Sequence, residues 1–271
     1  MTRLMLFGVA CFAMVAATTY QSEIAEWRRA REERLKAEGG WLSVAGLFWL
    51  HEGANRFGKD PGNDVVLPDG PAQAGVFELR GGKVAVIMDG KSRALAPDSA
   101  DVAKVGRLNL FVIKRGDRYG IRLKDPDSEY RRNYHGIESY PVKEEWRITA
   151  RWVAAPKKVP ILNIIGITED SECPGYAVFE IAGKEYRLSP IIEQPGDQQL
   201  FYIFRDLTTG KETYPAGRFF YSEMPKDGKV ILDFNKAYNP PCAFTPYATC
   251  PLPPKENHLE LRVEAGEKTY H

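Results

Sequence analysis

The chain of 271 residues is 44% hydrophobic and 27% charged, which is a globular composition long enough to bury a sizeable core. Its 37 Lys and Arg residues nearly balance 36 Asp and Glu residues, so the net charge is +1. A protein that grips a nucleic acid by its phosphates needs a basic excess on one face. The balanced charge therefore argues against nucleic acid as a partner.

The N-terminus has the pattern of an export signal. Arg3 precedes an apolar run from Leu4 to Ala17, which has the length of a signal-peptide core and is too short to span a bilayer as a helix. The sequence thus predicts a signal peptide over residues 1–17 and an exported protein, periplasmic or extracellular, with no stable membrane span after its removal. An uncleaved N-terminal membrane anchor and a lipoprotein modified at Cys11 are the alternatives.

A helix is expected directly after the signal. Ser22 can cap its N-terminus, and Glu23 suits the positive end of the helix dipole. Gly39-Gly40 is a typical helix stop. These features predict an N-terminal α-helix over residues 22–39.

From Trp41 onward, short alternating segments predict a mainly β fold. Glu145 to Trp152 alternates polar and apolar residues, as a strand with one buried face does. Arg115 to Arg118 and Ala182 to Lys184 have the composition of hairpin turns. The prediction is a β-sandwich or a two-lobed β structure behind the N-terminal helix, forming a single β-rich domain over residues 41–271. The alternative is two packed subdomains divided near residue 105.

Residues 53–79 resemble the opening of a forkhead-associated domain, a β-sandwich that binds phosphothreonine. In that family an Arg follows the glycine of the second strand, and a Ser and a His follow the next turn. Here Lys59 follows Gly58, and the turn at Pro71 to Ala74 holds neither Ser nor His. Without a bidentate Arg the phosphate lacks its planar partner. The resemblance therefore implies sandwich architecture without phosphopeptide binding.

No motif for a metal or a cofactor stands out. There is no zincin motif, no Gly-x-Ser-x-Gly, no glycine-rich phosphate loop and no Cys-x-x-Cys. Asp125 to Glu129 alternates carboxylates like a calcium loop, but Tyr130 stands where such a loop needs glycine. We interpret this stretch as a turn in which Asp127 or Ser128 caps a short helix. The sequence predicts no metal and no cofactor.

The segment after residue 239 is rich in proline, which fixes φ and removes backbone donors. Its prolines are Pro240, Pro241, Pro246, Pro251, Pro253 and Pro254. Such a segment cannot form a central strand, yet its Phe, Tyr and Cys residues favour burial. Nearby polar side chains can form hydrogen bonds with the backbone of this segment, or can point into a pocket that the rigid segment preorganises. The candidate ligand-binding residues are Arg218, Asp233, Asn235, Tyr238, Asn239 and Asn257. Asp233 and Asn235 are expected to share one face of a strand.

The same region resembles a known family. Asp233 to Asn235, Tyr238 to Cys242, Cys250 to Pro254 and Glu264 to Lys268 are similar to the signature of the bacterial and archaeal family called domain of unknown function 1684. The resemblance extends over roughly residues 40 to 270. It implies one domain of a known group and assigns no activity and no catalytic residues.

Cysteine placement leaves alternatives open. An exported protein meets an oxidising compartment, so Cys242 and Cys250 are a candidate disulfide. Two buried free thiols are the second interpretation. A metal site that recruits Cys173 or His258 is the third, although no ligand pair has finger spacing.

The predicted function is binding of an unknown small molecule, in a pocket built by the proline-rich C-terminal segment. The alternative is a hydrolase that uses Asp233 and Arg218, and a purely structural envelope protein is a further hypothesis. Binding is favoured because no nucleophile with a recognisable base is visible.

Export yields a direct prediction. N-terminal sequencing of the mature protein should begin near Thr18, because Val15-Ala16-Ala17 offers the small residues that signal cleavage needs. Recovery of an intact Met1 from envelope material would contradict signal cleavage and indicate an uncleaved membrane anchor.

Overall fold

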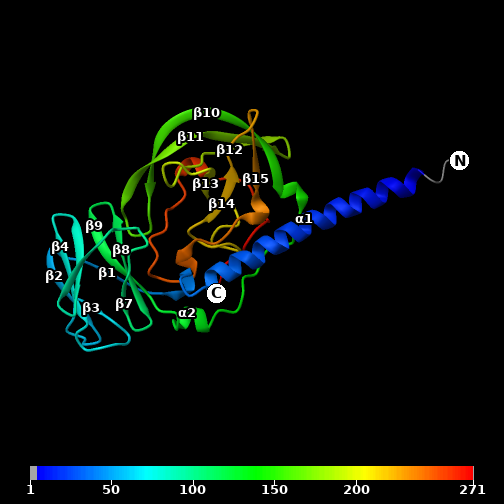
Figure 1. Ribbon diagram of the computed structural model, residues 1–271. Helices are drawn as coiled ribbons and strands as arrows, with labels where there is room; N and C mark the ends of the chain where they lie inside the picture. The colour runs from blue at the N-terminus through cyan, green and yellow to red at the C-terminus, as the bar shows by residue number, and fades with distance from the viewer. Residues whose placement is uncertain (1–4, 271) are drawn as a thin grey trace. The chain divides into compact units, whose positions relative to one another are not determined.

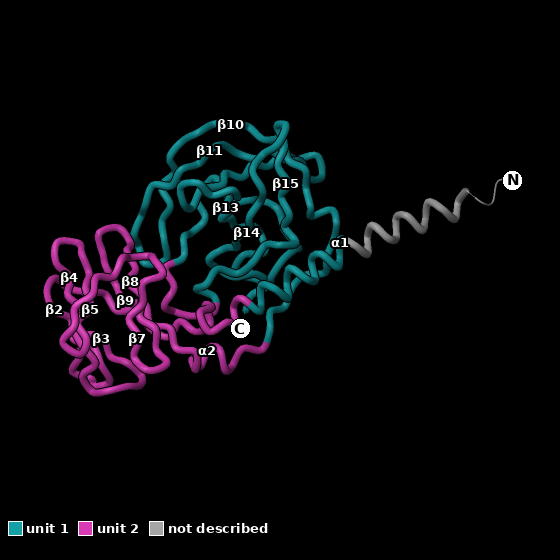
Figure 2. The backbone as a smooth tube through the Cα atoms, in the orientation of Figure 1, with its two compact units in different colours: residues 1–33, 136–243, 250–271 teal, residues 34–135, 244–249 magenta. Residues whose placement is uncertain are grey.

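The computed structural model describes residues 5–270, with side chains from residue 20 onward. The fold is mainly β, as predicted, and the chain divides into two compact units (Figure 2). Unit 1 contains residues 1–33, 136–243 and 250–271, and unit 2 contains residues 34–135 and 244–249. Residue 105, where the sequence suggested a division, lies inside unit 2.

The N-terminal helix α1 (Met5–Lys36) is longer than predicted at its start and shorter at its end. Ser22 was expected to cap the helix but lies inside it, because no proline or other breaker precedes it to stop the helix there. The helix ends before Gly40, where a Cβ atom would lie 2.3 Å from the carbonyl oxygen of Arg34. Tyr20 and Ile24 are buried on its inner face.

The predicted signal peptide, residues 1–17, lies outside the residues whose side chains are described. Within the described part of the chain, no helix combines the length and apolar character that a membrane span requires.

Unit 2 is a sandwich of two antiparallel sheets, apart from one short parallel pair of strands. One sheet has the order β1-β9-β8-β7 and the other the order β3-β2-β4-β5-β6. The strands are β1 (Val44–Trp49), β2 (Gly53–Gly58), β3 (Val65–Val66), β4 (Gly75–Arg80), β5 (Lys83–Met88), β6 (Lys91–Leu95), β7 (Ala103–Val105), β8 (Leu108–Arg115) and β9 (Arg118–Lys124). Their inner faces share a core in which Phe57 and Phe77 stack at 4.4 Å. The predicted hairpin at Arg115 to Arg118 joins β8 to β9.

Two elements of unit 2 lie beside its sandwich. The 3-10 helix Trp41–Ser43 precedes β1, and the short helix α2 (Glu129–Arg132) follows β9. Ser128 caps α2, as one of the two predicted residues, by accepting a hydrogen bond from the Arg131 N–H at 3.2 Å.

Unit 1 is built on the long curved hairpin of β10 and β11, which lies at the top of the view in Figure 1. One sheet has the order β12-β11-β10-β15, and β13 pairs with β14 in a second. The strands are β10 (Arg147–Leu162), β11 (Thr168–Ile181), β12 (Lys184–Leu188), β13 (Gln199–Phe204), β14 (Arg218–Glu223) and β15 (Lys229–Asp233). Short 3-10 helices cover Glu144–Trp146, Phe234–Lys236, Pro241–Ala243 and Lys255–Asn257.

The core of unit 1 is aromatic and centres on Phe234. Its ring lies 5.2 Å from the Phe220 ring, 5.5 Å from Phe204 and 5.9 Å from Phe179. The alternation predicted for β10 is confirmed, because Trp146 and Ala150 are buried while Arg147 and Arg151 are exposed. The predicted turn at Ala182-Gly183 joins β11 to β12, and both residues have positive φ.

The exposed face of β10 and the aromatic core of unit 1 predict contrasting mutational effects. Arg147→Ala should change the free energy of unfolding by less than about 1 kcal/mol, because its ion pair with Glu23 is exposed and 3.5 Å long. Phe234→Ala should cost about 3 to 5 kcal/mol, because it opens a cavity in the aromatic core. Denaturant titration of both variants measures the difference. Comparable losses of stability would contradict the assignment of Arg147 to the surface and of Phe234 to the core.

Candidate functional site

The predicted ligand-binding residues lie in unit 1, and the structure shows what each one contacts. Arg218 begins β14 and is only 1% exposed. Its guanidinium donates to the carbonyl oxygens of Ala265 at 2.5 Å and Val263 at 3.0 Å, and to Asp206 Oδ1 at 3.3 Å. Arg218 therefore fastens the end of the chain to the second sheet.

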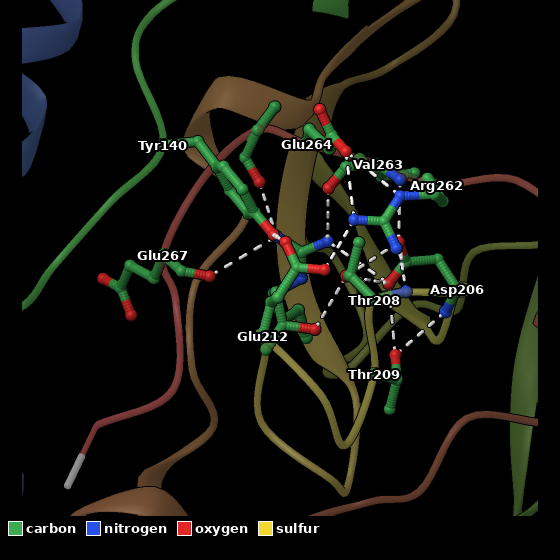
Figure 3. A network of polar contacts seen from close by, with 12 residues as sticks. Tyr140, Asp206, Thr208, Thr209, Glu212, Arg262, Val263, Glu264 and Glu267 are labelled. Atoms are coloured by element: carbon green, nitrogen blue, oxygen red, sulfur yellow. Dashed lines mark hydrogen bonds and ion pairs between the residues drawn. The ribbon is translucent and has the colours of Figure 1, made fainter.

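Asp206 is the buried partner of Arg218. Its carboxylate accepts hydrogen bonds from the Thr208 hydroxyl at 2.9 Å, from the Thr209 hydroxyl at 3.1 Å and from the Val263 N–H at 2.8 Å (Figure 3). Burial lowers the pKa of the Arg218 guanidinium, and the charge of Asp206 counteracts that effect. Asp206 was not among the predicted residues, although an Asp followed by Thr208 and Thr209 directly after an apolar strand is a turn signal.

Asp233 and Asn235 connect helix α1 to the C-terminal part of unit 1. The Tyr20 hydroxyl donates to Asp233 Oδ1 at 2.8 Å, and Asn235 Nδ2 donates to that hydroxyl at 3.0 Å and to the Lys143 carbonyl at 2.8 Å. The two residues do not share a strand face as expected. Strand β15 ends at Asp233, which caps the following 3-10 helix by accepting from the Asn235 N–H at 3.2 Å.

The remaining predicted residues contact other parts of unit 1. Asn257 Nδ2 donates to the carbonyl oxygens of Ser189 at 2.8 Å and Ile203 at 2.9 Å. The Asn239 N–H donates to Glu267 Oε2 at 2.6 Å. The Tyr238 ring lies 4.3 Å from the Arg31 guanidinium carbon. Neither cavity described below is lined by any of the predicted residues.

A small polar cavity of about 140 Å³ lies in unit 1. It is lined by Arg28, Glu32, Ile137, Ser139 and Glu267. Glu267 is already paired with Arg31 at 2.6 Å. Arg28 Nε is buried and has no hydrogen-bond partner among the residues whose side chains are described, and a bound water would supply one. The cavity therefore suits water or a small ion rather than an organic ligand.

A larger groove of about 520 Å³ lies in unit 2. Its apolar lining comprises Ala45, Phe48, Val66, Leu67, Pro68 and Leu123. Two tyrosines line it as well, Tyr130 from α2 and Tyr247 from the proline-rich segment, with ring centroids 6.4 Å apart at 73°. The groove thus combines an apolar wall with an edge-to-face aromatic pair.

The charges that line the groove are unevenly paired. Asp125 is 4% exposed and accepts from Arg107 Nε at 2.8 Å and from a terminal nitrogen of the same side chain at 3.1 Å. Arg132 pairs with Asp127 at 3.1 Å. Glu129 is exposed and has no ion-pair partner among the residues that the structure describes. The groove therefore carries one uncompensated negative charge.

The loop at residues 244–249 places Tyr247 at the groove. The Thr245 hydroxyl donates to the Val44 carbonyl at 2.9 Å, and the Thr249 hydroxyl accepts from Arg115 Nε at 2.9 Å. These contacts attach the loop to β1 and β8. Tyr247 lies in the proline-rich segment but was not among the predicted ligand-binding residues, because its partner Tyr130 is remote in sequence.

Cys173, Cys242 and Cys250 are thiols in this structure. The Cys242 N–H donates to Cys250 Sγ at 3.2 Å, so the two residues lie side by side. Their disulfide stays a prediction. No group of three potential metal ligands occurs in the part of the chain that the structure describes.

The chain belongs to the family described as Protein of unknown function (DUF1684), whose model matches residues 132–268. This confirms the resemblance drawn from the C-terminal motifs. The chain is also similar to a solution NMR structure of an uncharacterised protein from gene locus rrnAC0354 of Haloarcula marismortui. The identity is 30%, the match covers 51% of this chain and 79% of that one, and the TM-score is 0.43. No curated protein matches the chain.

The buried ion pair predicts a large effect on stability. Arg218→Ala should lower the free energy of unfolding by about 3 to 5 kcal/mol, because Asp206 would remain buried without its counter-charge. Arg187→Ala is the matched control, since its partner Glu185 is exposed, and should cost less than about 1 kcal/mol. Denaturant unfolding distinguishes the two. A near-neutral Arg218→Ala variant would contradict a structural role for the pair.

Proposed function

We propose that the protein is an exported small-molecule-binding protein whose ligand occupies the groove of unit 2. The proposed ligand has an apolar body and a positively charged group. The observation that carries the proposal is the groove itself, where Tyr130 and Tyr247 share the lining with the exposed carboxylate of Glu129. Tyr247 belongs to the proline-rich segment, so this segment contributes to the pocket through its loop.

The size and lining of the groove support an organic ligand. A volume of about 520 Å³ lies within the range of small-molecule sites, which run from about 300 to 1,000 Å³. Phe48 and Leu123 offer apolar surface to the body of the ligand. Tyrosine faces attract cations through the ring quadrupole.

The charge pattern supports a cation over an anion. Arg107 and Arg132 line the groove, but each already pairs with an aspartate. An anionic ligand would have to compete with those carboxylates. Glu129 gives a positively charged group an available partner at the same surface.

The hydrolase hypothesis has less support. Arg218 is enclosed by backbone carbonyls and Asp206, and Asp233 joins Tyr20 and the start of a 3-10 helix. Neither side chain lines either of the described cavities. Both contribute to the rigidity of unit 1, which is a structural role compatible with binding in unit 2.

Calorimetric titration with benzyltrimethylammonium tests the proposal. Binding should weaken about tenfold in Tyr247→Ala and about threefold in Glu129→Gln, because cation–π and surface charge contacts are each worth on the order of 1 kcal/mol. Glu145→Gln removes an exposed carboxylate from unit 1 and should leave the affinity unchanged. Benzoate, which has a similar ring and the opposite charge, should bind more weakly. Equal affinity for benzoate, or no effect of Tyr247→Ala, would contradict the proposal.

A further inference from the structure

The two cysteines of the proline-rich segment mark the ends of the loop that carries Tyr247. Residues 244–249 belong to unit 2, whereas the residues before and after them belong to unit 1. The chain therefore leaves unit 1 after Ala243 and returns to it at Cys250. Cys242 and Cys250 lie at the two ends of this excursion.

Both cysteines are held in place by the backbone of unit 1. The Tyr214 hydroxyl donates to the Cys242 carbonyl at 2.8 Å, and the Ile164 N–H donates to the Cys250 carbonyl at 2.9 Å. The Cys242 N–H donates to Cys250 Sγ at 3.2 Å. Two thiols thus lie next to each other on fixed backbone.

The two thiols differ in accessibility and acidity. Cys250 is buried, while Cys242 is half-buried. The hydrogen bond with the Cys250 thiol lowers the pKa of Cys242, which favours its thiolate, the reactive form. Burial raises the pKa of Cys173 and disfavours reaction there. Among the three cysteines whose side chains the structure describes, Cys242 is therefore the most open to attack by an oxidant.

We propose that Cys242 and Cys250 form a reversible oxidation site that fixes the loop bearing Tyr247 and so regulates ligand binding in the groove. This inference rests on the proposed function of that groove. The oxidant is a small disulfide, and the disulfide between the two cysteines is the modification.

The reaction balances as two thiol–disulfide exchanges. The Cys242 thiolate attacks one sulfur of the small disulfide, forms a mixed disulfide and releases one thiolate. Cys250 then loses its proton, attacks the Cys242 sulfur and releases the second thiolate. Two protons and two electrons pass to the small disulfide, which becomes two thiols.

A disulfide between Cys242 and Cys250, at the two ends of the loop, limits the positions that Tyr247 can take. A loop held at both ends loses less conformational freedom when a ligand orders it. The oxidised protein should therefore bind more tightly than the reduced one. Thr245 and Thr249 already attach the loop to unit 2, so oxidation adds a constraint without creating a new contact.

The test begins with oxidised glutathione as the disulfide. After treatment of the purified protein, alkylation and peptide mass spectrometry should show a bond between Cys242 and Cys250, with Cys173 still a thiol. Amide hydrogen exchange in residues 243–249 should slow on oxidation. The Kd for benzyltrimethylammonium should fall at least about threefold, because preorganisation lowers the entropic cost of binding. In Cys250→Ser, exchange and Kd should not respond to the oxidant.

Two outcomes would overturn the inference, and a third would separate it from the proposed function. Cys242 that stops at a mixed disulfide with glutathione overturns the inference, as does an intramolecular disulfide that changes neither exchange nor Kd. If oxidation slows exchange in residues 243–249 but neither form binds benzyltrimethylammonium, the proposed function fails, while oxidative fixation of the loop is supported.

Discussion

The buried ion pair of Arg218 and Asp206 is the constraint on which the C-terminal part of unit 1 depends. A guanidinium that is 1% exposed requires a counter-charge and several hydrogen-bond acceptors, because burying an unpaired charge is expensive. Asp206 provides the counter-charge, and the carbonyl oxygens of Val263 and Ala265 provide acceptors. Satisfying Arg218 thereby fixes the path of the last residues. The irregular backbone that follows β15 can stay ordered because its polar groups have such partners.

The predicted polar residues hold the structure of unit 1 and are separate from the residues that line the groove of unit 2. Asp233, Asn235 and Asn257 hold irregular backbone to neighbouring elements, and none of them lines a described cavity. The proline-rich segment has a second role through residues 244–249, which join unit 2 and bring Tyr247 opposite Tyr130. Anchoring the loop through Thr245 and Thr249 reduces the conformational freedom that Tyr247 loses on binding.

Local patterns allowed much of the fold to be predicted from the sequence. The alternation from Trp146 to Trp152 and the turn at Ala182-Gly183 act between near neighbours, so periodicity and turn chemistry identify them. The predicted start of α1 at residue 22 was wrong, because Ser22 can cap a helix only if the chain before it is not helical. The groove was not predictable, since Tyr130 and Tyr247 meet only through tertiary structure. Likewise, the sequence does not show whether polar side chains near a rigid segment face a pocket or bond to the backbone.

The central claim is that ligand binding belongs to the groove of unit 2 and that the buried network around Arg218 is structural. Two-dimensional amide NMR during a titration with benzyltrimethylammonium tests it most directly. The account predicts shifts concentrated at residues 129–132 and 245–249, with the amides of Asp206, Arg218 and Asp233 unmoved. Shifts centred on those three residues, with the groove unaffected, would contradict it.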